Sequence, residues 1–174
     1  MSDGYAKYSS IFESAKGNTT YAPGENNCII SGNTILLVAP AYKGPDGNGV
    51  FYLTSGAQVT EVGDFAFSGN VHLTKVILPE VKSVGRFAFS ECEKLKEVVF
   101  APLTYIGDYA FERTALTKLV DLASGITEIG SFAFSETKLT EVTIGNNIVI
   151  GKGAFKNCHD LTKISIGDNV VVGV

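Results

Sequence analysis

The side chains of this sequence best suited to nucleophilic or metal chemistry are three cysteines and two histidines, namely Cys28, Cys92, Cys158, His72 and His159. A thiolate activated by a histidine is a common nucleophile, and sets of four Cys and His residues hold zinc. Three cysteines cannot all pair within one chain. The sequence also lacks Gly-x-Ser-x-Gly, His-Glu-x-x-His and a phosphate-binding glycine-rich loop. We therefore expect no catalytic residue.

The acidic residues provide no second candidate for a reaction centre. Asp46-Gly47-Asn48-Gly49 begins like a calcium-binding loop but lacks the later Asp, Asn and Glu ligands, so we interpret it as a hairpin turn. The other Asp and Glu residues are scattered, with no evident pair for acid–base catalysis. The sequence therefore predicts no metal site and no cofactor.

Composition and charge argue against two classes of partner. The formal net charge is −4 and the isoelectric point is about 5.2, which disfavours a nucleic-acid backbone as the main partner. No apolar run approaches the ~20 residues of a membrane-spanning helix, so we expect no membrane insertion. A hydrophobic content of 45% with 18% charged residues is typical of a folded soluble domain.

A repeated phrase of about 22 residues organises most of the chain. It reads (Val or Ile)-Gly-x-(Phe or Tyr)-Ala-Phe, and its glycines follow one another at steps of 22, 22, 23, 21 and 22 residues. These glycines are Gly63, Gly85, Gly107, Gly130, Gly151 and, in a truncated sixth copy, Gly173. Repetition at such a period indicates a solenoid. We expect the last phenylalanines of the five complete copies to stack as an aromatic spine in its core: Phe67, Phe89, Phe111, Phe134 and Phe155.

A second phrase, Leu-x-x-(Val, Ile or Leu), follows each copy and carries the strands. Its apolar and polar residues alternate with period two, which predicts short strands with one buried face. One turn cannot bury its own apolar face, so successive copies should stack in parallel about 4.8 Å apart. The third copy is irregular, which predicts a bulge or longer turn near Asp121 to Gly125.

The stacking also places the cysteines. Cys92 and Cys158 occupy the same position three repeats apart, which corresponds to about 14 Å between them. A disulfide needs α-carbons within about 7 Å. We therefore predict that both cysteines stay reduced and buried as small apolar residues.

Two outward columns of the strand face form the candidate partner-contact surface. The first alternates in charge, so that each residue should meet an opposite charge on the next strand: Lys75, Glu97, Lys118, Glu141 and Lys163. Such pairs contribute roughly 0.2–1 kcal/mol each, and a solvated column that maintains register explains them equally well. The second column begins with an exposed apolar patch made of Ile77, Val99 and Val120. Cover by the N-terminal hairpin or a neighbouring module is the plainer explanation of that patch.

A further aromatic column consists of Phe65, Phe87, Tyr109 and Phe132. We expect these rings to pack against the turn on the opposite face of the coil. A carbohydrate-binding stripe is the alternative.

The repeated phrases resemble the BspA-like leucine-rich repeats of bacterial and protist surface proteins. The matching pattern is Ile-Gly-x-(Phe/Tyr)-Ala-Phe followed by Leu-x-x-Val-x-Ile, and it covers residues 59–174. Cys92 and Cys158 lie three residues after the spine phenylalanine, where this family often carries Cys. The resemblance implies a mainly β leucine-rich-repeat solenoid, a right-handed coil of short parallel strands. It also implies a surface or secreted role in adhesion or partner binding, and no chemistry.

We divide the chain into an N-terminal segment, residues 1–58, and a repeat array, residues 59–174. Residues 28–53 of the first part resemble a β-hairpin that interrupts repeats in this family, with a turn at Ser31-Gly32-Asn33 and a re-entering strand at 49–53. The array stops in mid-repeat without a polar cap. We therefore expect either a fragment of a longer array or end-to-end self-association through the C-terminus.

These observations favour a non-catalytic binding or adhesion scaffold of a cell-surface or secreted protein, with a protein or glycan as ligand. The alternative is a structural spacer within a longer multidomain chain. An enzyme with its site in residues 1–58 is a remote alternative, because active sites need pockets with convergent polar groups. The chain begins without a stretch that resembles a signal peptide, so the extracellular location rests on the resemblance.

Overall fold

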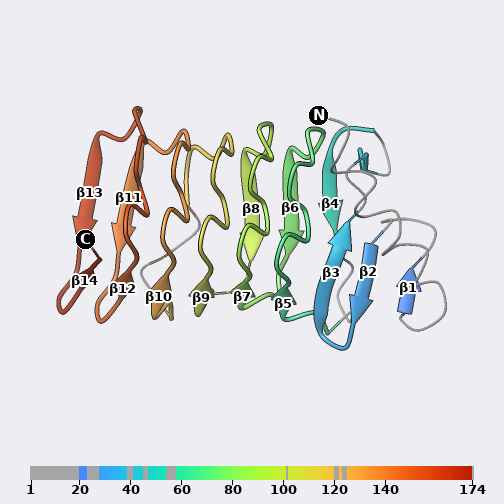
Figure 1. Ribbon diagram of the computed structural model, residues 1–174, viewed down its shortest axis with the longest axis horizontal. Helices are drawn as coiled ribbons and strands as arrows, with labels where there is room; N and C mark the ends of the chain where they lie inside the picture. Colours follow the sequence, from blue (N-terminus) through green and yellow to red (C-terminus); the bar gives the residue numbers. More distant parts are fainter. Residues whose placement is uncertain are drawn as a thin grey trace.

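The computed structural model describes residues 20–22, 28–38, 41–44, 47–53, 58–100, 102–119, 122 and 125–173. These residues form a solenoid of short strands in which successive coils lie side by side (Figure 1). The mainly β repeat solenoid expected from the 22-residue period is confirmed. Residues 1–19 and 23–27 lie outside the described part.

One wall of the solenoid is a sheet with the strand order β1-β2-β3-β5-β7-β9-β10-β12-β14. Its strands are β1 (Thr20–Ala22), β2 (Cys28–Ser31), β3 (Thr34–Val38), β5 (Glu61–Val62), β7 (Ser83–Val84), β9 (Tyr105–Ile106), β10 (Glu128–Ile129), β12 (Val149–Ile150) and β14 (Val171–Val172). From β3 onward all pairings are parallel, and the valine or isoleucine before each repeat glycine pairs with its equivalent in the next coil. The repeat phrase therefore sets the register.

The other wall is divided into two sheets. The first contains β4 (Val50–Tyr52), β6 (Lys75–Leu78) and β8 (Glu97–Phe100), and the second contains β11 (Glu141–Ile144) and β13 (Lys163–Ile166). Between them, the irregular third repeat contributes only an isolated parallel bridge from Leu122 to Ile144 among the described residues. Most of the segment predicted to bulge, including residues 121, 123 and 124, lies outside the described part.

The predicted hairpin is formed by β2 and β3, which pair antiparallel around Gly32 and Asn33. Gly32 has a φ of 58°, as a tight hairpin turn requires. β3 then pairs in parallel with β5, so the hairpin continues the long sheet. β4 joins the other wall beside β6, as expected for the strand that re-enters the repeats. The domain boundary between residues 58 and 59 stays a prediction.

The aromatic spine runs through the core as predicted. Consecutive spine rings from Phe67 to Phe155 stack with centroids 4.6, 5.2, 5.3 and 5.5 Å apart. Phe51 precedes them with an edge-on contact to Phe67 at 4.8 Å. The alanine before each spine phenylalanine is also buried. A single core thus connects the two walls.

The repeat glycines are required by the approach of neighbouring coils. A Cβ at Gly107 would lie 2.7 Å from the backbone nitrogen of Arg86 and 2.8 Å from the carbonyl carbon of Gly85. The Gly107 N–H also donates to the Val84 carbonyl at 2.8 Å. A side chain at this position would push the coils apart, so glycine recurs at each equivalent bend.

A small apolar cavity of about 10 Å³ lies in the core near the irregular third repeat. Its lining includes Val98, Phe100, Leu119 and Leu122. A cavity of this volume has room for about one water molecule, so it is a packing defect and too small for a ligand.

Candidate partner-binding surface

The outward face of β6 and β8 carries four of the predicted contact residues, which we call the strand-face patch: Lys75, Ile77, Glu97 and Val99. Lys75 pairs with Glu97 in register, and the Lys75 Nζ lies 2.7 Å from the Glu97 Oε1. Ile77 pairs with Val99 in the same ladder, and both side chains are half-buried. The structure thus brings a charged pair and two apolar side chains together on one sheet face.

The rest of the alternating column does not continue as predicted. Lys118 is exposed and lies outside any strand, because the third repeat breaks this wall between β8 and β11. Glu141 and Lys163 are register partners, yet on this wall of the described chain only Lys75 and Glu97 form an ion pair. The predicted alternation thus holds in register for Lys75 with Glu97 and for Glu141 with Lys163, and it is interrupted at Lys118, which lies in no strand. Val120 lies outside the described residues, so its place in the patch stays a prediction.

The turns that follow the repeat glycines lie on one side of the solenoid, which we call the turn face. This face carries an aromatic ladder, defined as Phe65, Phe87, Tyr109 and Phe132. Its rings stack nearly parallel, with centroids 4.9, 4.6 and 5.0 Å apart and interplanar angles between 4° and 13°. Phe65 is 43% exposed and the others are half-buried. The expectation that these rings pack against the opposite turn was wrong, because each ring packs against its equivalents in the neighbouring coils.

Backbone conformation directs the aromatic ladder outward. All four residues have positive φ values, between 53° and 60°, a region that bulky residues rarely adopt. Carboxylates fix the turns that precede the rings. The Asp64 carboxylate accepts the Arg86 N–H at 2.7 Å, one coil further on, and Asp108 accepts the Ser131 N–H at the same distance. Contacts between coils therefore hold each ring in this strained conformation.

The stacking decides which part of each ring is accessible. Sugars stack on the faces of aromatic rings, whereas in a face-to-face ladder the inner faces are covered by neighbouring rings. At the end of the ladder opposite to Phe65, the Lys156 Nζ lies over the ring of Phe132, 5.7 Å from its centroid. The ladder therefore presents mainly ring edges, which suits packing against a protein surface better than a stripe of sugars.

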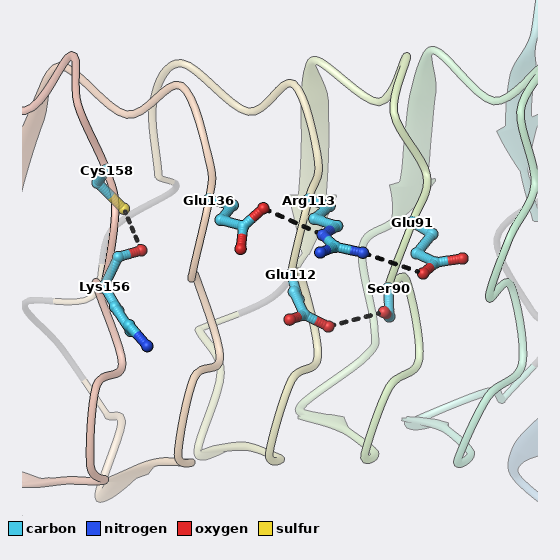
Figure 2. A network of polar contacts seen from close by, with 7 residues as sticks. All are labelled: Ser90, Glu91, Glu112, Arg113, Glu136, Lys156 and Cys158. Atoms are coloured by element: carbon cyan, nitrogen blue, oxygen red, sulfur yellow. Dashed lines mark hydrogen bonds and ion pairs between the residues drawn. The ribbon is translucent and has the colours of Figure 1, made fainter.

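A second charged column lies on the turn face and was not anticipated from the sequence. Arg113 lies between two carboxylates, with its Nη1 3.5 Å from the Glu91 Oε1 and its Nε 3.1 Å from the Glu136 Oε2 (Figure 2). The pKa of the Arg113 guanidinium is raised, mainly by the hydrogen bond that Arg113 donates to Glu136. These residues follow the spine phenylalanine by two positions, so the alternation could have been found by aligning that position across the repeats.

The cysteine position is occupied differently in two coils. Cys92 is fully buried and donates from its Sγ to the Phe67 carbonyl at 3.1 Å, and burial raises its pKa to about 12. Cys158 makes the equivalent bond to Phe134 at 3.1 Å but is partly exposed. Both thiols are free, as predicted, whereas the expected burial of Cys158 was wrong, because its side chain is partly exposed in the last described coil.

The described residues contain no group of three or more His, Cys, Asp or Glu side chains that could hold a metal ion. His72 is half-buried and His159 is exposed, and they lie in different coils. In the same part of the chain, no helix is long and apolar enough to cross a bilayer.

Solved structures of bacterial leucine-rich repeat proteins share this fold. A protein from Eubacterium ventriosum is 25% identical with a TM-score of 0.64, over 81% of this chain and 39% of its own. A protein from Bacteroides ovatus is 22% identical with a TM-score of 0.66, over 84% of this chain and 41% of its own. A protein from T. pallidum is 24% identical with a TM-score of 0.62, over 80% of this chain and 77% of its own. The chain thus spans about two fifths of the length of the first two.

No curated protein sequence matches the chain significantly. The BspA-type leucine-rich repeat region, in contrast, matches residues 53–172 in six copies. That range includes the glycines of the five complete repeats, the spine phenylalanines and the aromatic ladder. The chain therefore belongs to the BspA-type leucine-rich repeat family.

Proposed function

We propose that this chain is a non-catalytic binding or adhesion module of a cell-surface or secreted protein, with a protein or glycan as its ligand. The observation that carries the proposal is the strand-face patch, where an ion pair borders two half-buried apolar side chains on a sheet. Apolar side chains rimmed by charged groups are typical of protein contact sites. Membership of a repeat family of surface proteins, which are typically non-catalytic, supports the same proposal.

The solenoid suits this role because it holds side chains at fixed spacing. Parallel strands in register place equivalent residues about 4.8 Å apart along the stack, and the ladder from Lys75–Glu97 to Leu78–Phe100 shows this for β6 and β8. A pre-organised surface loses little conformational entropy on binding. Of the two kinds of ligand, a protein is favoured, because the stacked rings of the aromatic ladder expose mainly their edges.

A structural spacer within a longer chain is the second candidate. This candidate is favoured because the chain covers only 39% and 41% of the length of two similar solved structures. A spacer projects other modules and needs no ligand of its own. The two candidates therefore differ in whether substitutions in the strand-face patch change binding.

The test is a binding screen of the purified chain against arrays of extracellular-matrix proteins and host glycans. The double variant Ile77→Asp with Val99→Asp should lose at least about tenfold in affinity for any ligand found, because a buried carboxylate disrupts an apolar contact. Thr143→Asp is the matched control, since Thr143 lies outward on β11 and is exposed. Thermal unfolding of all variants verifies that they are folded.

Two results would overturn the binding role. Blank arrays would favour the spacer. Equal loss of affinity in the control variant would place the contact surface elsewhere on the solenoid.

A further inference from the structure

Each turn on the turn face carries one column position before its ladder ring and another after it. The upstream column consists of the residues that directly follow the repeat glycines: Asp64, Arg86, Asp108, Ser131 and Lys152. The downstream column lies two positions after the spine phenylalanines and includes the ion pairs of Figure 2: Gly69, Glu91, Arg113, Glu136 and Asn157. Most charged side chains of both columns are exposed, so they are accessible to a partner.

The two columns carry opposite charges within the same coil. Arg86 is followed five residues later by Glu91, and Asp108 is followed five residues later by Arg113. Contacts between neighbouring coils explain the alternation along each column, because Arg86 lies 3.9 Å from Asp108 and Arg113 pairs with Glu91 and Glu136. Those contacts do not require opposite signs across one coil. A surface that matches a copy of itself turned by 180° does require them.

We propose that two copies of this chain pack turn face against turn face, as a closed dimer with its twofold axis at the coil of Tyr109. Such an axis reverses the order of the coils and exchanges the upstream column of one copy with the downstream column of the other. Arg86 then faces Glu136 of the second copy, and Asp108 faces Arg113 of the second copy. Symmetry repeats each of these pairs, so opposite charges meet on both sides of the axis.

The charge pattern selects this position of the axis. Sliding the second copy by one coil would bring Arg86 opposite Arg113 and Asp108 opposite Glu91, so that like charges repel. Sliding it by two coils towards the N-terminus would restore opposite signs but would leave only three of the five repeats in contact. The axis at Tyr109 therefore keeps all five repeats in contact and places no like charges opposite each other in the two columns.

The sizes of the side chains also match in this arrangement. Exchange of the columns places each ladder ring over the position that directly precedes the downstream column of the second copy. Phe87 then lies over Ser135 of the second copy, and Phe132 lies over Ser90. Both serines are small and buried, at 3% and 4% exposure, so bulky rings meet low parts of the opposite surface. The ring edges of the aromatic ladder thereby gain a packing partner.

The turn face is small, so the dimer should be weak. Five coils at a spacing of about 4.8 Å give a length of roughly 20–25 Å. Interfaces below the standard ~800 Å² per partner are typical of transient complexes. Exposed charge pairs also determine register and orientation more than affinity. We therefore expect a dissociation constant in about the micromolar to millimolar range.

The dimer goes beyond the proposed function and is independent of it. Ile77 and Val99 lie on β6 and β8, on the outward side of a wall and not on the turn face. A dimer would present two copies of the strand-face patch, which raises avidity for a repetitive ligand. Failure of the dimer leaves the binding site intact, and the reverse also holds.

Sedimentation velocity at concentrations up to about 1 mM tests the association. The wild-type chain should convert from monomer to dimer as concentration rises. Arg86→Glu and Glu136→Arg should each raise the dissociation constant at least about tenfold, because each replaces two attractive contacts with two repulsive ones. Lys96→Glu makes the same change of charge as Arg86→Glu and is the matched control. It should dimerise normally, since Lys96 is exposed directly before β8. Thermal unfolding verifies that all variants are folded.

Mixing the two charge variants tests the orientation of the copies. In the mixed dimer, the carboxylate introduced at position 86 faces the guanidinium introduced at position 136, and the native Arg86 and Glu136 face each other. The mixture should therefore dimerise more strongly than either variant alone, with an affinity close to that of the wild type.

Three results would overturn the proposal. The wild-type chain could stay monomeric at all concentrations, the two charge variants could dimerise like the wild type, or their mixture could associate no better than its components. Association through the ends of the solenoid would equally contradict the proposal, because it would leave all of these variants unaffected and would produce open-ended oligomers if head to tail.

Discussion

The coil of β11 and β12 and the coil of β13 and β14 have nearly the same sequence pattern but different environments. Ile144 in the first is 3% exposed, whereas its register partner Ile166 in the second is 57% exposed. The apolar residue is of the same type and lies in the same ladder. This difference shows that a core side chain becomes buried only when the next coil packs against it.

The two coils also differ in how many stabilising contacts they receive from their neighbours. An interior coil gains apolar contacts and backbone hydrogen bonds on both sides, and the last coil gains them on one side only. Equivalent substitutions should therefore cost more in the interior. Pairs of equivalent positions in an interior coil and in the last described coil therefore test this difference.

The largest difference is expected for the aromatic spine. Phe111→Ala should lower the free energy of unfolding by about 3–5 kcal/mol, because it leaves a cavity between two stacked rings. Phe155→Ala should cost less than half as much, since Phe155 stacks on one side only and is partly exposed. Urea unfolding measures both values. Equal losses would show that the position in the stack does not determine the contribution.

A smaller difference is expected at the repeat glycines. Gly107→Ala should cost about 1–3 kcal/mol, because the added Cβ would lie 2.7 Å from the Arg86 nitrogen in a packed interior. Gly173→Ala should be tolerated better, since its nearest contact would be 3.0 Å and the last coil can move outward. Thermal unfolding of the two variants compares them, and an equal or larger loss at Gly173 would be unexpected.

The spine and the strand registers could be predicted because they follow from periodicity alone. An apolar strand residue that recurs in every repeat and alternates with polar residues is expected to face the core in each coil. The orientation of the aromatic ladder could not be predicted in this way. Phe65 and Phe67 are separated by one residue, and the positive φ of Phe65 decides that one ring points outward and the other inward.

Other features depend on neighbours that the repeat pattern does not specify. The wall breaks at the third repeat, so the charge alternation ending in Lys118, Glu141 and Lys163 was predicted without knowing which strands pair. The exposure of Cys158 depends on whether a further coil covers it. Arg113 was missed because its column alternates in a turn, where no strand pattern draws attention to it.

Thiol reactivity compares the same position in two environments. Iodoacetamide should modify Cys158 at least about tenfold faster than Cys92 in the native chain, because Cys92 is buried and burial raises its pKa to about 12. This pKa lies above the ordinary value of 9.0, so the stability that the neutral thiol contributes below pH 9 should be lost as the pH rises towards 12. Mass spectrometry of labelled peptides follows both sites, and equal rates would mean that Cys92 is accessible.

The smallest effect is expected for the charged strand face. A double-mutant cycle on Lys75 and Glu97 should yield a coupling energy of roughly 0.2–1 kcal/mol, because the pair is partly exposed. The same cycle on Glu141 and Lys163 should yield a smaller coupling, since these register partners form no ion pair. A larger coupling in the second pair would show that the wall is continuous in solution.

Amide hydrogen exchange at the spine phenylalanines tests the stacking most directly. The amides of Phe67, Phe89, Phe111 and Phe134 donate to the next coil, and the account predicts that they exchange slowly. Phe155 should exchange much faster. Uniform exchange at all five positions, or fast exchange at Phe89 and Phe111, would contradict a continuous stack of coils.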